Sequence, residues 1–166
     1  MSRLVVLFSY ALLTFIARPA AAQEVLRAYC GRDGKAHLVF RNGAARTLPT
    51  REKQVGCDHV TVARDGRTVG WSVLVENRCT SYPIPIAVVV YHNGKQTVIS
   101  PYQMVWEWRF TDEGKRVAVL SGQVHGDPTA ADLYDAQNGK ALARWDGKGT
   151  PPIWAIGWEQ QFASRE

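Results

Sequence analysis

Apolar and polar residues alternate along short segments of the chain, and this period of two is typical of half-buried β-strands. Residues 69–75 place Val69, Trp71, Val73 and Val75 on one face, and residues 105–110 place Trp106, Trp108 and Phe110 on one face. Residues 84–91 are apolar almost throughout, which predicts a strand that is buried on both faces. Beyond residue 22, only residues 154–162 offer a short helix. The pattern therefore predicts a mainly β protein.

Pairs of residues that end in glycine separate these segments. Between residues 33 and 139, six of them have Asp, Asn or Glu before Gly: Asp33-Gly34, Asn42-Gly43, Asp65-Gly66, Asn93-Gly94, Glu113-Gly114 and Asn138-Gly139. Glycine, and to a lesser degree Asn or Asp, adopts the positive φ that tight hairpin turns require. Regular turns of this kind predict a series of antiparallel hairpins in one all-β domain.

Two stretches of the chain match each other in order and spacing. Residues 64–69 (RDGRTV) correspond to residues 112–117 (DEGKRV), and residues 90–95 (VYHNGK) correspond to residues 133–140, where Leu-Tyr-Asp precedes Asn-Gly-Lys. The turn glycines lie 48 residues apart in the first match (Gly66, Gly114) and 45 apart in the second (Gly94, Gly139). A third, shorter copy occupies residues 32–43. The chain therefore contains an internal repeat.

This repeat resembles the blades of β-propellers, in particular the WD-repeat-like and TolB-like blades of exported bacterial proteins. The resemblance covers residues 30–145 and implies small twisted antiparallel sheets that stack on one another. A closed propeller needs about four blades or more, whereas this chain has two full copies and one partial copy. The resemblance therefore implies about three blade-like sheets in a partial or open propeller. A β-sandwich or meander is the alternative.

The first 22 residues have the organisation of a secretory signal peptide. Arg3 supplies the positive charge, residues 4–16 are mostly apolar, and three alanines at residues 20–22 offer a cleavage site. The apolar run is too short for the roughly 20 residues of a membrane-spanning helix. We therefore expect residues 1–22 to be a signal peptide, residues 23–166 to form a single domain, and the protein to be exported to the periplasm or secreted.

The charge of the chain gives little support for a nucleic-acid partner. Removal of residues 1–22 takes away Arg3 and Arg18 and no acid, so the 20 basic and 15 acidic residues become 18 and 15. The remaining bases are scattered among acids and form no run.

All three cysteines, Cys30, Cys57 and Cys79, follow the predicted signal peptide, and an oxidising compartment permits a disulfide. Because three is odd, at least one cysteine stays unpaired within the chain. We expect Cys57 to pair with Cys79, since the two flank a predicted hairpin and would meet at its open end. Cys30 is then the free thiol.

No constellation of residues predicts an active site. The four histidines, His37, His59, His92 and His125, lack the spacing of metal ligands, and no Cys-x-x-Cys pair occurs. The Gly-x-Ser-x-Gly motif of serine hydrolases and a phosphate-binding glycine loop are also missing from the sequence. We therefore predict no catalytic residue, no metal and no cofactor.

Two loops are candidate binding sites. Tyr82, Pro83 and Pro85 lie in a segment that its prolines would stiffen, and rigid exposed loops can present a surface to a partner. His125 and Asp127 lie in the connection formed by residues 121–129. The alternatives are a loop that only starts a buried strand and an ordinary polar connection. The six tryptophans are better explained by core packing than by a sugar-stacking surface.

The sequence favours an exported, non-enzymatic binding or interaction module for a protein or a small ligand. One alternative is a small hydrolase or lyase with a site in residues 121–129. Another is a structural subunit that completes a ring by self-association. The self-association alternative predicts a homo-oligomer with an exposed apolar sheet edge near residues 27–40 or 141–145.

Overall fold

The computed structural model describes residues 23–162, and the predicted signal peptide, residues 1–22, lies outside the described residues. The described chain is all-β and forms three antiparallel sheets, as predicted. Sheet 1 contains β1 (Val25–Cys30), β2 (Ala36–Phe40) and β3 (Ala45–Thr47). Sheet 2 contains β4 (Gln54–Val62), β5 (Val69–Val75), β6 (Ile84–His92) and β7 (Lys95–Ile99). Sheet 3 contains β8 (Met104–Thr111), β9 (Arg116–Gly122), β10 (Pro128–Asp135) and β11 (Ala141–Trp145).

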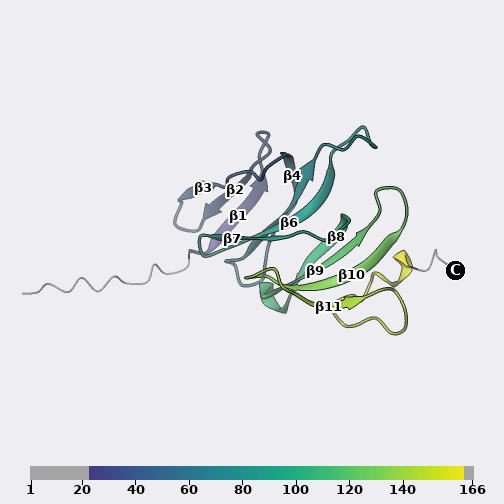
Figure 1. Cartoon of the computed structure of the whole chain (residues 1–166). Coiled ribbons are helices and arrows are strands. Elements are labelled where there is room, and N and C mark those ends of the chain that lie inside the picture. Colours follow the sequence, from purple (N-terminus) through teal and green to yellow (C-terminus); the bar gives the residue numbers. More distant parts are fainter. Residues whose placement is uncertain (1–22, 163–166) are drawn as a thin grey trace, which may run out of the picture.

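Each sheet is a meander of consecutive strands, and each is completed before the next one begins. The predicted partial copy lies in the three-stranded sheet 1, and the two predicted full copies lie in the four-stranded sheets 2 and 3. The sheets follow one another across the molecule in sequence order, with the C-terminal segment beyond sheet 3 (Figure 1). This arrangement fits both a blade-like stack and a sandwich.

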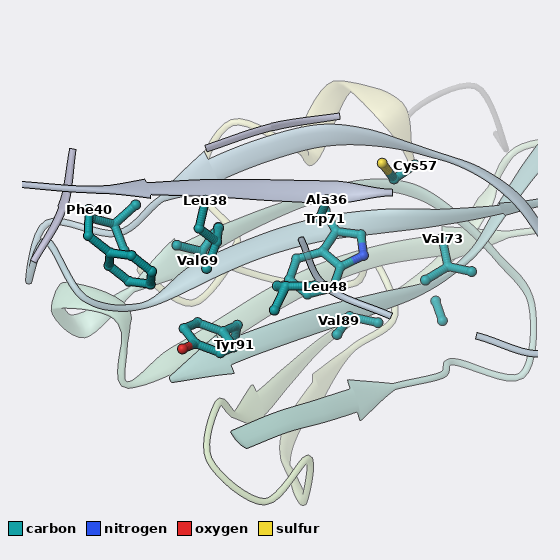
Figure 2. Close-up of a cluster of buried hydrophobic side chains, with 12 residues drawn as sticks. Ala36, Leu38, Phe40, Leu48, Cys57, Val69, Trp71, Val73, Val89 and Tyr91 are labelled. Atoms are coloured by element: carbon teal, nitrogen blue, oxygen red, sulfur yellow. The ribbon is translucent and has the colours of Figure 1, made fainter. Parts of the chain in front are cut away.

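The first apolar core lies between sheets 1 and 2. Leu38 and Phe40 of β2 point toward Trp71 of β5 and Tyr91 of β6, and all four side chains are buried (Figure 2). The alternation predicted for residues 69–75 places Val69, Trp71 and Val73 in this core. Since β6 is buried on both faces, its other face is available to sheet 3.

The second core lies between sheets 2 and 3 and is centred on Trp108. The indole Nε1 of Trp108 donates a hydrogen bond of 2.9 Å to the hydroxyl of Ser72 on β5. Gly70 on the same strand lets the ring approach, because a Cβ there would lie 2.5 Å from the indole. Val88 and Val90 of β6 complete the sheet 2 side of this core.

The C-terminal segment covers the outer face of sheet 3. Trp158 and Phe162 pack on Leu120 of β9 and its apolar neighbours, and Trp158 is 1% exposed. Arg109 of β8 holds the segment in place: its guanidinium carbon lies 4.2 Å from the centre of the Trp158 ring, and its Nη2 donates to the carbonyl oxygen of Ile156 (2.6 Å). The helix predicted for residues 154–162 is reduced to one 3₁₀ turn (Glu159–Gln161).

Strands β8 and β4 each carry a bulge that the sequence pattern did not predict. The register of β8 against β9 shifts between Val105 and Glu107, so that Val105 and Trp108 are buried while Trp106 is 41% exposed. The prediction that Trp106 shares one face with Trp108 is therefore wrong. The register of β4 against β5 shifts in the same way between Asp58 and Thr61.

Two acids in the turns, Asp65 and Asp135, accept hydrogen bonds from backbone N–H groups. Asp65 accepts the N–H groups of Arg67 and Thr68, and Asp135 accepts those of Gln137 and Asn138. In each turn, two amide hydrogens that the turn would leave unpaired find an acceptor.

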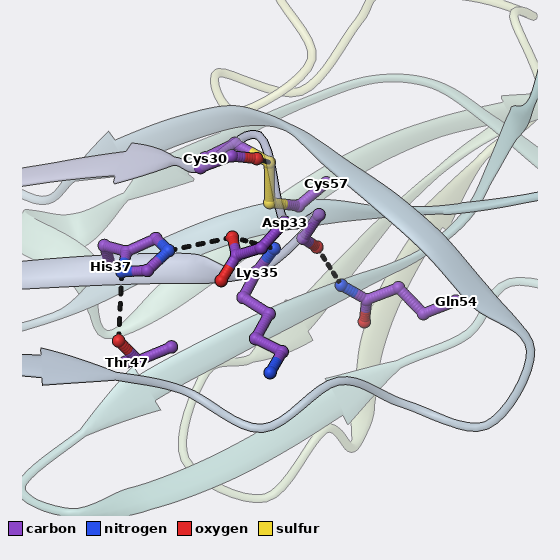
Figure 3. A network of polar contacts seen from close by, with 9 residues as sticks. Cys30, Asp33, Lys35, His37, Thr47, Gln54 and Cys57 are labelled. Atoms are coloured by element: carbon purple, nitrogen blue, oxygen red, sulfur yellow. Dashed lines mark hydrogen bonds and ion pairs between the residues drawn. A yellow bond between two sulfur atoms is a disulfide. The ribbon is translucent and has the colours of Figure 1, made fainter.

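The disulfide joins Cys30 to Cys57, so the predicted pairing of Cys57 with Cys79 is wrong (Figure 3). It links the end of β1 in sheet 1 to β4 in sheet 2, with Cα atoms 5.7 Å apart. Cys79 is the free cysteine and is exposed, whereas Cys30 had been expected to be free. The prediction failed because the stacking of two sheets, and not the local hairpin, brings the paired cysteines together.

A polar network surrounds the disulfide. Gln54 Nε2 donates to the carbonyl oxygen of Gly34 (2.9 Å), which fixes the β1–β2 turn against β4. On the outer face of sheet 1, His37 bridges Asp33 and Thr47 through its two ring nitrogens, at 2.9 and 3.0 Å (Figure 3). The hydrogen bond from His37 lowers the pKa of Asp33.

Candidate functional site

The two loops that the sequence singled out lie together at one end of the molecule. They are the β5–β6 connection, residues 76–83, and the β9–β10 connection, residues 123–127, which project on the same side of the stack (Figure 1). His125 Nε2 donates a hydrogen bond of 3.2 Å to the carbonyl oxygen of Cys79. This bond joins loops that are 46 residues apart in sequence.

A third loop, the β7–β8 connection (residues 100–103), completes this end of the molecule. The hydroxyl of Thr129 on β10 donates to the side-chain oxygen of Gln103, which holds the loop against sheet 3. Tyr102 at its tip is fully exposed, with a relative exposure of 104%. We call the three loops together the loop end.

An open hollow of about 660 Å³ lies at the loop end. Its lining comes from the β7–β8 loop, the start of the β9–β10 loop and β6, and includes Ile86, Tyr102, Met104, Gln123 and His125. The volume falls within the range of small-molecule sites, roughly 300–1,000 Å³. The hollow combines an exposed tyrosine, apolar side chains and a few polar groups.

The predicted binding-loop residues are distributed around the loop end. Tyr82 is 62% exposed and, with Pro83, lines a smaller hollow beside the β5–β6 loop. Pro85 pairs with Leu74 at the start of β6, so it contributes to a strand as well as to the surface. Asp127 is exposed next to His125 but does not line the large hollow. The structure therefore brings His125 to the hollow and leaves Asp127 at its margin.

Another hollow, of about 230 Å³, opens where the edges of sheets 2 and 3 meet. Asp58 and His59 of β4 line one side, and Trp106, Glu107 and Trp108 of β8 line the other. Sequence reasoning did not single out these residues, because a strict period of two cannot reveal a bulge. The spacing Trp-Glu-Trp on an edge strand was the one available signal.

No histidine at the loop end forms a pair with a carboxylate. The partner of His125 is a backbone carbonyl. His92 does lie near Asp65, but Thr68 stands between them: its Oγ1 donates to Asp65 Oδ2 (2.6 Å) and lies 2.8 Å from His92 Nδ1. Thr68 is 2% exposed, so its hydroxyl is inaccessible to a substrate. This triad stabilises the turn and does not resemble a hydrolase site.

The perturbed carboxyl groups lie away from the loop end. Burial raises the pKa of Asp132 on β10, and the charge of Arg144, 3.5 Å away, only partly opposes this effect. For Asp65 burial acts in the same direction, but it is outweighed by hydrogen bonds from the Thr68 hydroxyl and from the amides of Arg67 and Thr68, which lower its pKa. Both groups therefore act on stability and not on a surface site.

Within residues 23–162, no three His, Cys, Asp or Glu side chains are placed to hold a metal ion. In the same part of the chain, no helix has the length and apolar character needed to cross a membrane. In comparisons with known proteins, no family model matches the chain, and no curated protein shows significant similarity to it.

Proposed function

We propose that this protein is an exported binding module that recognises its ligand at the loop end. The observation that carries this proposal is the hydrogen bond from His125 to the carbonyl oxygen of Cys79, because it joins two loops of different sheets beside a hollow of ligand size. Loops held on a rigid scaffold are the usual place for binding residues.

The composition of the loop end supports a binding role. Tyr82 and Tyr102 are exposed there, together with Ile86 at the margin of the hollow. Tyrosine supplies a large contact area at a low cost in side-chain entropy and is enriched in protein interfaces. The proposed ligand is therefore a polypeptide segment.

The disulfide and the N-terminal pattern support export. Structural disulfides such as Cys30–Cys57 are typical of oxidising compartments. Residues 1–22 have the charge and apolar pattern of a secretory signal. Under this proposal, the sheets are blades of the WD-repeat-like or TolB-like kind, used as a scaffold.

The C-terminal segment favours a self-contained module over a ring subunit. It occupies the outer face of sheet 3, where a blade from another subunit would have to stack. The exposed large apolar side chains at the two candidate edges are Leu26 and Tyr29 on β1 and Leu142 on β11, and such a small number is ordinary for a protein surface. Light scattering on the mature protein is therefore expected to give the mass of a monomer.

A displayed library of random peptides tests the binding proposal. We expect selection on the immobilised mature protein to enrich peptides whose binding is lost in Tyr102→Ala and Tyr82→Ala and kept in Tyr29→Ala, a matched change on the outer face of sheet 1. Tyr82 and Tyr102 are exposed, so neither change is expected to unfold the protein. Enriched peptides that bind all three variants equally, or no enrichment at all, would overturn the proposal.

A further inference from the structure

The large hollow at the loop end differs from the smaller ones in the charge of its lining. Within residues 23–162, no Asp, Glu, Lys or Arg lines this hollow of about 660 Å³. By contrast, Glu76 lines the hollow beside the β5–β6 loop, and Lys95 lines one beside the β6–β7 turn. We call the large hollow, whose lining includes Ile86, Tyr102 and His125, the neutral hollow.

Apolar side chains form much of the wall of the neutral hollow. They come from three elements: Ile86 from β6, Tyr102 from the β7–β8 loop and Met104 from the start of β8. Ile86 is 38% exposed and Tyr102 is fully exposed, so an apolar group that docks here removes their surface from water. Methionine is unbranched and adapts to its neighbours, so Met104 lets the wall fit aliphatic side chains of different shape.

Two polar side chains in the lining have a fixed hydrogen-bonding role. The Nε2–H of His125 is used in the bond to the carbonyl oxygen of Cys79, so Nδ1 of the neutral ring is left as an acceptor. The side-chain oxygen of Gln103 accepts the hydroxyl of Thr129, so its amide nitrogen is left as a donor. A peptide group needs one donor and one acceptor, and this lining contains both.

A charged ligand group would be disfavoured in the neutral hollow. It would lose hydration there and meet no opposite charge among the described lining residues; Asp127, the acid beside the loop that carries His125, does not line the hollow. Burial of an unpaired charge destabilises a complex, whereas burial of apolar surface stabilises it by roughly 25 cal/mol per Å². The lining therefore favours uncharged apolar groups and selects against charged ones.

We propose that the neutral hollow binds an extended polypeptide segment whose side chains are apolar, and that it discriminates against charged segments. The walls take the aliphatic side chains, while the Gln103 amide and His125 Nδ1 pair with a backbone C=O and N–H of the segment. That the ligand is a polypeptide rests on the proposed function. Apolar segments are mostly buried in folded domains, so the partner presents this one in an unfolded stretch of its chain.

Nuclear magnetic resonance of the Met104 methyl group tests this proposal without a known partner. Met104 is the one methionine beyond residue 22, so its signal is assigned at once. The probe is the blocked pentapeptide acetyl-Ala-Leu-norleucine-Leu-Ala-amide, and we expect a saturable shift with a Kd on the order of 1 mM. The matched probe has lysine in place of norleucine, which adds a charge to the same straight chain. We expect it to bind roughly tenfold more weakly.

Variants that add a charge locate the site. Gln103→Glu keeps an oxygen that can accept the Thr129 hydroxyl, but it replaces the amide donor with a carboxylate. We expect it to weaken binding of the norleucine peptide by roughly fivefold and to strengthen binding of the lysine peptide relative to the parent protein. Gln123→Glu, an exposed position in the same lining, should act in the same directions. The matched control is Gln137→Glu in the exposed β10–β11 turn, which should change neither Kd.

Four results would overturn this assignment. They are no saturable shift with the norleucine peptide, equal binding of the lysine peptide, displacement of the norleucine peptide by N-acetylglucosamine, and Kd values that neither lining variant changes. If any of these is found while peptides selected from the library still depend on Tyr82 and Tyr102, only the preference for apolar segments fails. If no peptide binds at the loop end either, the binding module fails as well.

Discussion

The disulfide is expected to contribute a large part of the stability of the stack. Cys30 and Cys57 are 27 residues apart, and in the chain-entropy relation a loop of that length stabilises the folded state by about 3.5 kcal/mol at 25 °C. The relevant perturbation is the double variant Cys30→Ala/Cys57→Ala. Typical domains are stable by only about 5–15 kcal/mol, so this loss would be easy to detect.

The variant should still fold, because other contacts hold sheets 1 and 2 together. Leu38 and Phe40 remain packed against Trp71, and Gln54 still bonds to the carbonyl oxygen of Gly34. Urea unfolding of the protein, followed by tryptophan fluorescence, is therefore expected to show one transition at a lower midpoint. Its slope should be equal to that of the parent or steeper, because the unfolded chain without the bond is less compact.

Cys79→Ser is the matched control, because Cys79 is exposed and free. It should leave the unfolding free energy within about 0.5 kcal/mol of the parent value. Peptide mapping without reduction should recover Cys30 linked to Cys57. A loss below about 1 kcal/mol in the double variant, or an equal loss in Cys79→Ser, would refute the reasoning.

Three further predictions concern the core and pH. Gly70→Ala should destabilise the protein by roughly 1–3 kcal/mol in urea unfolding, because the added Cβ would lie 2.5 Å from Trp108; an unchanged midpoint would show that the indole can move away. Asp132→Asn should raise the free energy of unfolding at pH 7, because the folded-state pKa of Asp132 is raised and its ionised form therefore destabilises the folded protein above that pKa. The gain from the substitution should shrink as the pH falls through the folded-state pKa. A gain that persists at acidic pH would contradict this cause. The pKa of Asp65 is lowered in the folded state, so its contribution to the free energy of unfolding is present above the unfolded-state pKa near 3.9 and is lost as the pH falls toward the folded-state pKa. The stability of Asp65→Asn in acid should therefore depend less on pH than that of the parent protein.

Strands with regular alternation could be predicted from the sequence. The segment 69–75 coincides with β5, and the apolar run 84–91 lies within β6, which is buried on both faces. The reason is local: each residue's exposure follows from its place in a pleated strand between two sheets.

Features set by contacts between sheets could not be predicted. The bulge at Trp106 turns that side chain away from the face of Trp108, and nothing in the local pattern marks the extra residue. The partner of Cys57 depends on how β1 stacks beside β4, whereas hairpin proximity favoured Cys79. The approach of His125 to Cys79 likewise needs both sheets in place.

The contiguous order of the strands has a consequence for how the chain folds when its N-terminal part becomes available first. Neighbouring strands meet after short turns, so little entropy is lost in closing each hairpin, and each sheet can form from the segment already exposed. The Cys30–Cys57 bond can close once β4 has emerged, long before the last strands are available. Each sheet in turn covers the apolar face of the sheet before it. The outer face of sheet 3 is covered only when Trp158 follows, so it is the last apolar face to be removed from water.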